Sequence, residues 1–372
     1  MESIINVGID VHKDTYSICS YDPRTDKYLY EHKMKAETKN VLKYLESVKK
    51  QIGEEIMFVC GYEAGPTGFG LCRDLLKADI SCVVMAPTSL KRSCGKKMKT
   101  DKIDAKLLAK DLFTKDYSPV HLSTQKEEAI KEYCRMRREI MTELKTVKQV
   151  LLSFLLRQGK KYEDGCNYWT VRHKEWLKKV TFDEPYLQEV FEEYMVSVNT
   201  LENRLKTVNA RLEEICSDSE VKAKVDRLVC FCGIDNLTAV SIVSEVGDFN
   251  RFSKAWHFSN FVGLTIREDS SGLHEKKLGI TKAGNCYLRR LFTESAKSIK
   301  RSNAKGIKSS RLSKRQEGNS PEVIAYADKC RYRLKKKIIH LESRGKHSNV
   351  ATTAAARELA CFVWGMMTDN IA

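Results

Sequence analysis

The sequence predicts an α/β N-terminal domain, a helical coiled-coil middle region and a mainly α C-terminal domain that ends in a basic tail. Three observations support this. Strand and helix patterns alternate up to about residue 120, two long stretches between residues 121 and 229 carry helical periodicity, and short helices with glycine turns follow from residue 230. The predicted domains are therefore 1–120, 121–229 and 230–372.

The N-terminal elements follow in the order three strands, helix, strand, helix, strand, helix. "SIINVGIDV" is a buried strand that ends at Asp10, "TYSICSYD" and "KYLYEHKMK" alternate as hairpin partners, and "NVLKYLESVKKQ" has helical periodicity. "EIMFVCGYEA" is an apolar strand that ends at Glu63, followed by a helix ("TGFGLCRDLLKA"), a strand ("ISCVVMAP") and a helix ("DKIDAKLLAKDL"). This order predicts an antiparallel meander that leads into parallel strands.

The middle region holds two long helical stretches. In the second, apolar residues recur at coiled-coil spacing, namely Leu187, Val190, Tyr194, Val198, Leu201, Leu205 and Val208. Two interpretations remain open: the helices pack only within their own domain, or they dimerise. Between them, "CNYWTVRHKEWLKK" is rich in aromatic residues, which serve either core packing or stacking on RNA bases.

The charge favours a polyanionic partner. The chain has 65 Lys and Arg against 49 Asp and Glu, a net charge of +16. The segment 297–346 holds sixteen Lys and Arg and four Asp and Glu, so it contributes +12 of that sum. A second basic cluster runs from Lys91 to Lys110. Either run taken alone is also compatible with a solvated face.

The thirteen cysteines indicate reduced thiols, because their number is odd, no C-x-x-C spacing occurs and no signal peptide is recognised. The longest apolar runs, such as "ACFVWGMM", are shorter than the roughly 20 residues that a membrane span needs. We expect a cytoplasmic protein, active at the nucleoid of a prokaryotic cell, with no membrane partner.

Four carboxylates form the candidate metal site. Asp10 and Glu63 end two predicted parallel strands, where open α/β sheets place ligands. Asp101 and Asp104 are three residues apart, so they share one face of a helix. Each acid alone is compatible with an ordinary turn or a helix start, whereas the set in this order indicates a site.

The chemistry of these four residues favours a divalent cation. Converging carboxylates raise one another's pKa unless a cation lies between them. Oxygen ligands with no histidine or cysteine nearby favour Mg²⁺ or Mn²⁺. The adjacent Ile103, Leu107 and Leu108 are expected to form the buried side of this helix.

Several motifs resemble a known family. "GIDVHKD", "YEAGPTG" and "KTDKIDA" are similar to the RuvC-like, RNase H-fold DEDD domain of the insertion-sequence-110 family of transposases, which includes the pilin-gene invertase. "GDFNRFSKAWHFSNFVGLTIREDSSG" and "GITKAGNCYLRRLFTESA" are similar to the second, transposase domain of that family. The resemblance covers residues 4–115 and about 228–300.

The resemblance implies a DNA recombinase. Asp10, Glu63, Asp101 and Asp104 would bind the metal, and the serine before Gly272, Ser271, would be the nucleophile that forms a covalent phosphoserine link to DNA. Ser270 is its nearest rival. The family further implies donor and target DNA, an element-encoded guide RNA that pairs with both, and dimers that assemble into a tetramer with composite active sites.

The expected contacts to nucleic acid are basic residues of both runs and of the transposase domain: Lys97, Lys99, Lys102, Lys282, Arg289, Arg290, Lys335 and Lys336. One motif departs from the family. Where members commonly have a Pro-Gly-Ile-Gly turn, this chain reads Cys232-Gly233-Ile234-Asp235, and an acid there would weaken a backbone contact to phosphate.

Two other functions remain open from the residues alone. A junction-resolving nuclease would use water with the same carboxylates. A nucleic-acid-binding protein would keep them only as structural residues.

Overall fold

The computed structural model describes residues 3–371 apart from 53–55, 91–100, 164, 166, 272–273 and 303–306. The chain forms two compact units, Met1–Leu122 and Ser123–Ala372. The first is mixed α/β and the second is mostly helical, as the sequence predicts. The finer division at residues 120 and 229 stays a prediction.

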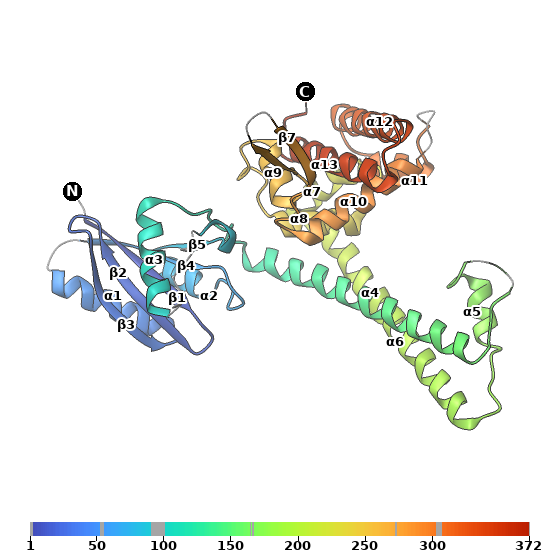
Figure 1. Cartoon of the computed structure of the whole chain (residues 1–372), viewed down its shortest axis with the longest axis horizontal. Helices are drawn as coiled ribbons and strands as arrows, with labels where there is room; N and C mark the ends of the chain where they lie inside the picture. The colour runs from blue at the N-terminus through green and yellow to red at the C-terminus, as the bar shows by residue number, and fades with distance from the viewer. Residues whose placement is uncertain are drawn as a thin grey trace. The chain divides into compact units, whose positions relative to one another are not determined.

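A five-stranded sheet in the order β3-β2-β1-β4-β5 forms the centre of the first unit (Figure 1). Its strands are β1 (Ser3–Val11), β2 (Thr15–Asp22), β3 (Lys27–Lys35), β4 (Ile56–Glu63) and β5 (Ser81–Met85). β1 pairs antiparallel with β2 and parallel with β4, and β4 pairs parallel with β5. The predicted meander and parallel strands are therefore confirmed.

The helices of this unit cover both faces of the sheet. They are α1 (Thr38–Ile52), α2 (Gly70–Lys77) and α3 (Asp101–Thr114), with a short 3-10 turn at Pro87–Ser89. Ile5, Val7 and Ile9 of β1 share a core with residues of α1 and α2. Alternate residues of a strand point to opposite faces, so the even-numbered residues of β1 face α3.

Gly8 is the point at which α3 meets β1. A Cβ atom built on Gly8 would lie 2.1 Å from the carbonyl oxygen of Ala105 and 2.4 Å from the amide nitrogen of Ala109. Any larger side chain would push the helix away from the strand. Because Ala105 and Ala109 are themselves small, the two backbones come close enough to fix the position of the first turn of α3.

The buried side of α3 differs from the predicted one. Leu108 is buried as expected, but Ile103 and Leu107 are more than a third exposed. The face against the sheet consists instead of Ala105, Leu108, Ala109 and Leu112. The prediction for Ile103 and Leu107 is therefore wrong, because close contact with Gly8 selects alanines rather than the largest apolar side chains.

Two long helices begin the second unit and lie side by side (Figure 1). They are α4 (Gln125–Arg157) and α6 (Pro185–Cys216), with the short α5 (Val171–Leu177) between them in sequence. Of the predicted apolar seam, Val198, Leu201 and Val208 are buried, and Leu187, Tyr194 and Leu205 pack against the same core. Val190 is the exception, because it is 42% exposed. The rest of the seam is filled within the chain, mainly by α4.

The aromatic-rich stretch packs around one histidine. His173 is fully buried, and rings of Tyr162, Trp169 and Trp176 lie with their centroids 4.9 to 5.5 Å from its ring. Burial lowers the pKa of His173, which favours the neutral ring. Core packing, one of the two interpretations of this stretch, is what Trp169 and Trp176 show.

The remaining elements build a helical body with one β-hairpin. In chain order they are α7 (Ser219–Leu228), α8 (Asn236–Val246), α9 (Ala255–Val262), β6 (Ile266–Ser271), β7 (His274–Ile280), α10 (Cys286–Arg301), α11 (Ser310–Gln316), α12 (Pro321–Ser343) and α13 (Ser348–Met367). Among the helices of the described residues, none is long and apolar enough to cross a membrane.

Replacing Gly8 with alanine should loosen the first unit. The added methyl group has no room beside Ala105, and such overpacking costs about 1–3 kcal/mol of unfolding free energy. Hydrogen exchange of β1 and α3 peptides along a urea titration measures this loss. Gly70→Ala is the control, because a Cβ there meets nothing within 4 Å. Equal stability of the two variants would contradict the proposed close contact.

Candidate active site

The sheet brings Asp10 and Glu63 to one edge and one face. Ile9 and Tyr62 are register partners in the parallel pair β1–β4, and both are buried on the α1 and α2 side. The next residue of each strand, Asp10 and Glu63, therefore points to the opposite face. That face is the one against which α3 packs.

Helix α3 begins with the other two acids. Asp101 and Asp104 both lie in its first turn, where the helix dipole favours negative charge. One oxygen of Asp10, one of Asp101 and one ring nitrogen of His12 lie within 4.8 Å of one another. The arrangement thus joins the end of β1 to the start of α3.

Two basic side chains, His12 and Lys33, contact this cluster of acids. The His12 Nε2 atom is 3.1 Å from Oδ2 of Asp10 and 3.8 Å from Oδ1 of Asp101. From β3, the Lys33 ammonium donates a hydrogen bond to Oδ2 of Asp101 over 3.0 Å. The sequence analysis missed both residues. For His12 a signal was available, because it stands two positions after Asp10.

The charges of the cluster act on one another. Burial raises the pKa of Asp10, His12 lowers it, and the charges of Asp104 and Asp101 raise it again. The hydrogen bond from Lys33 lowers the pKa of Asp101. The charge of Asp104 on α3 therefore reaches the carboxylate of Asp10 on β1.

These residues fit a divalent cation, but the donor set is not only oxygen. The expectation that no histidine lies near the carboxylates is wrong, because His12 contacts Asp10. One imidazole beside carboxylates suits Mn²⁺ at least as well as Mg²⁺. Burial and the neighbouring carboxylates raise the pKa of Asp10, and a divalent cation would offset both by favouring the ionised form.

The second candidate group lies on the β6–β7 hairpin. The strands pair antiparallel, with Ser270 opposite Glu275 and Ser271 opposite His274. Both serines therefore stand at the end of β6, next to the two-residue connection 272–273. Their side chains lie outside the described part of the structure.

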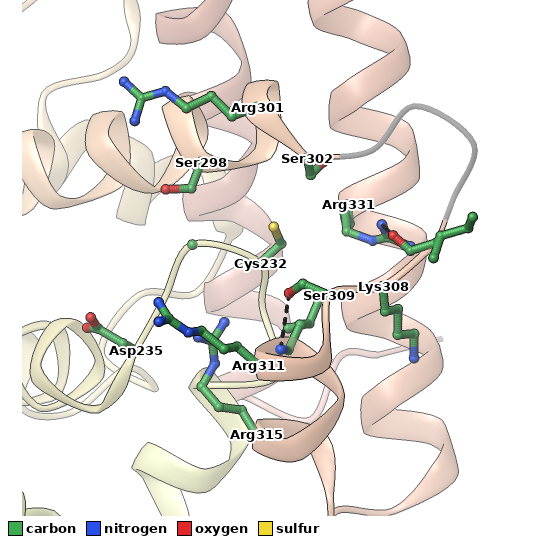
Figure 2. A pocket seen from close by; sticks show the side chains of 13 residues that line it. Cys232, Asp235, Ser298, Arg301, Ser302, Lys308, Ser309, Arg311, Arg315 and Arg331 are labelled. Atoms are coloured by element: carbon green, nitrogen blue, oxygen red, sulfur yellow. Dashed lines mark hydrogen bonds between the residues drawn. The ribbon is translucent and has the colours of Figure 1, made fainter.

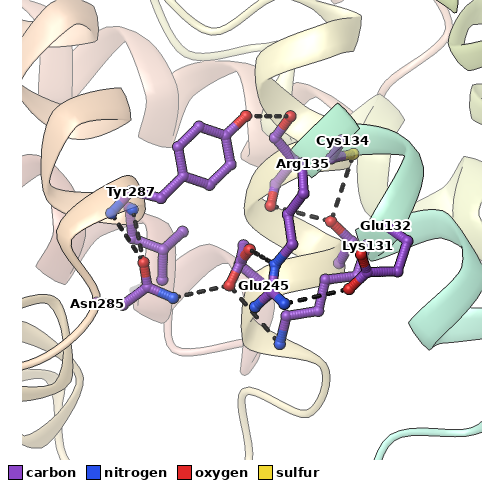
Figure 3. A network of polar contacts seen from close by, with 10 residues as sticks. Lys131, Glu132, Cys134, Arg135, Glu245, Asn285 and Tyr287 are labelled. Atoms are coloured by element: carbon purple, nitrogen blue, oxygen red, sulfur yellow. Dashed lines mark hydrogen bonds and ion pairs between the residues drawn. The ribbon is translucent and has the colours of Figure 1, made fainter. Parts of the chain in front are cut away.

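A buried carboxylate, Glu245, holds the end of the loop that follows this hairpin (Figure 3). Glu245 of α8 accepts a hydrogen bond from Asn285 Nδ2 over 2.8 Å and pairs with Arg135 of α4 at 3.1 Å. Lys131 lies 3.6 Å from the same carboxylate. Asn285 also caps the N-terminus of α10 and donates its backbone N–H to Phe261. The network fixes the loop that leaves β7 against α4.

Comparisons with known proteins agree over most of the chain. The DEDD-type transposase domain model of the IS110 group matches residues 7–158, and the model described as "Transposase IS116/IS110/IS902 family" matches residues 226–310. The transposase for insertion sequence element IS1533 of Leptospira borgpetersenii is 31% identical over 93% of this chain and 99% of its own length. The chain belongs to the IS110 family of transposases.

Two further relatives extend the match. The protein y4qE of Sinorhizobium fredii is 32% identical over 98% of this transposase and 88% of its own length. The transposase for insertion sequence element IS1111A of Coxiella burnetii is 24% identical over 81% of this chain and 79% of its own.

The basic residues expected to contact nucleic acid fall into three groups. Lys97 and Lys99 lie outside the described residues. Lys102, Lys282, Arg290 and Lys336 are exposed. Arg289 and Lys335 instead use their side chains within the fold, where they donate to the carbonyls of Val262 and Lys300. The role of all eight in binding stays a prediction.

Metal binding by this transposase should depend on Asp104. At a Mn²⁺ concentration one hundred times the Kd, binding adds about 2.7 kcal/mol to the unfolding free energy. Asp104→Asn should abolish the accompanying rise in Tm of the first unit, since it removes a carboxylate beside Asp10. Thermal unfolding with and without metal checks this.

The control is Asp14→Asn, at an exposed residue in the connection from β1 to β2. It should keep the full shift. A shift of equal size in Asp104→Asn and the wild type would rule out the carboxylate site at this place.

Proposed function

We propose that this transposase is a recombinase whose first unit is an RNase H-like, RuvC-type domain that holds a DEDD metal site. The sheet order β3-β2-β1-β4-β5 with α3 on one face supports the fold. The observation that carries the function is the meeting of Asp10, His12 and Asp101 within 4.8 Å on the face that also bears Glu63.

In this proposal Asp10, Glu63, Asp101 and Asp104 hold the metal, and His12 supplies a nitrogen donor beside them. When bound, Mg²⁺ or Mn²⁺ supplies positive charge that stabilises the charge developing on the attacking and leaving oxygens. Lys33 reduces the repulsion within the acidic cluster, because its ammonium bonds Asp101.

Ser271 is the proposed nucleophile. Its Oγ bonds to phosphorus while the bond from phosphorus to the departing deoxyribose oxygen breaks, and the serine proton is lost as that oxygen gains one. Reversal by another strand's oxygen rejoins DNA without ATP, because the ester keeps the energy of the phosphodiester. The place of Ser271 at the end of β6, in a hairpin followed by the loop whose end Glu245 holds, supports this assignment.

The proposed recombinase would act with nucleic-acid partners and with other copies of itself. We propose donor and target DNA, an element-encoded guide RNA that selects both, and homodimers that assemble into a tetramer. The net charge of +16 and the basic segment 297–346 support polyanionic partners.

One experiment separates the three candidate functions. Incubation with Mg²⁺, the RNA from the element's flanks and labelled donor DNA should give a protein–DNA adduct that survives denaturant. Ser271→Ala should abolish both adduct and recombination, whereas Ser270→Ala should retain them. Asp104→Ala should abolish the chemistry and leave RNA binding intact.

The other outcomes point to the other functions. Cleavage without an adduct, unchanged in Ser271→Ala, would instead identify a nuclease that uses water. Binding without any cleavage by the wild type would favour the nucleic-acid-binding protein.

The long helices offer a surface for the proposed dimer. Because the apolar seam of α6 packs on α4, the dimer contact has to use side chains left exposed, such as Val150 of α4 and Val196 of α6. The double variant Val150→Glu/Val196→Glu should lower the mass measured by light scattering at least twofold. Val171→Glu, at an exposed residue of α5, should not. An unchanged mass in the double variant would exclude this surface.

A further inference from the structure

A cavity in the second unit is lined by several positively charged side chains (Figure 2). None of its lining residues belongs to the carboxylate cluster or to the β6–β7 hairpin. Its volume is about 570 Å³, within the roughly 300–1,000 Å³ typical of sites for whole small molecules. Its walls come from the turn 232–235, from α10, α11 and α12, and from the described residues between α10 and α11, such as Lys308. The lining includes five cationic side chains: Arg301, Lys308, Arg311, Arg315 and Arg331.

The one acid in the lining is already engaged. Asp235 is the N-cap of α8, and its Oδ1 accepts a hydrogen bond from the Thr238 amide over 2.8 Å. Its charge is thus directed to the helix N-terminus. The acid that replaces the family's glycine therefore caps a helix, and the cavity keeps an excess of positive charge.

Buried contacts hold the walls in place. Gln316 is 3% exposed, and its side-chain nitrogen donates to the carbonyl of Cys230 over 3.1 Å while its oxygen accepts from Lys308. Lys308 also pairs with Asp328 of α12 at 2.5 Å. A Cβ on Gly233 would lie 2.5 Å from the Ser295 carbonyl oxygen, so the turn packs directly on α10. The cavity is thus bounded by a fixed framework.

Two arginines of the lining remain available to a ligand. Arg301 and Arg311 are exposed, and neither side chain makes a hydrogen bond or ion pair with any described residue. One guanidinium group can donate two parallel hydrogen bonds to two oxygens of the same phosphate. Several cations around one cavity repel one another, and an anionic group placed between them removes that repulsion.

We propose that this cavity binds a phosphodiester of nucleic acid, with Arg301 and Arg311 as its principal contacts. Its volume of about 570 Å³ exceeds that needed for a single phosphate, so an adjoining sugar could also enter. The inference rests on the proposed function only in that the transposase handles nucleic acid. It requires neither the serine nor the metal.

The test compares two double variants that remove the same charge. Arg301→Gln/Arg311→Gln alters the cavity, whereas Lys329→Gln/Arg344→Gln alters exposed residues of the same basic segment outside it. Fluorescence anisotropy in EDTA measures binding to a labelled 20-nucleotide RNA, the DNA strand of the same sequence and its duplex. EDTA prevents cleavage, so failure of the recombination mechanism does not affect the readout.

The cavity variant should bind at least one probe tenfold more weakly at 0.15 M salt. Its slope of log affinity against log salt should fall by about 1.4 for a single strand or 1.8 for a duplex, as two lost phosphate contacts require. The control should stay within twofold of the wild type. A loss confined to RNA or to DNA identifies the source of the phosphodiester. Equal effects of the two variants, or none, would overturn the proposal.

Discussion

The close contact between Gly8 and α3 is the constraint on which the candidate metal site depends. With the Ala105 carbonyl oxygen only 2.1 Å from where a Cβ would stand, α3 lies directly on β1. This fixes Asp101 and Asp104, in the first turn of the helix, beside Asp10 two residues further along the strand. Carboxylates from two elements can share one cation only when those elements lie close together, and here the backbone contact at Gly8 sets that distance.

The same proximity creates repulsion that the fold offsets in part. Burial raises the pKa of Asp10 and the charges of Asp104 and Asp101 add to the rise, while His12 lowers it and Lys33 bonds Asp101. These contacts let the acids remain close before any metal binds. They also define a competition, since a cation that takes Asp101 as a ligand has to displace the Lys33 ammonium or share the carboxylate with it.

Much of the first unit could be predicted, because strands and helices leave periodic patterns and the order of elements limits the topology. Asp10 and Glu63 were located from strand ends alone. The partners of those acids could not be found in the same way. Lys33 lies on β3, 68 residues before Asp101 in the chain, and it bonds Asp101. No local pattern encodes such a pair. The wrong assignment of Ile103 and Leu107 has a related cause. A hydrophobic pattern predicts that the largest apolar side chains are buried, but it does not show how closely the helix approaches Gly8.

In the second unit the least predictable feature is the set of contacts that holds the loop after β7 in place. Glu245 is a buried acid, and burial of an unpaired charge would be costly. Its partners, Lys131, Arg135 and Asn285, come from two other segments more than 35 residues away, so the ion pairs and hydrogen bond form only when α4, α8 and the loop after β7 are assembled. The loop that follows the hairpin of Ser270 and Ser271 is therefore held in place only once these segments have assembled. The proposed nucleophile, Ser271, would need such a fixed framework, because a serine must approach phosphorus along one line to displace the leaving oxygen.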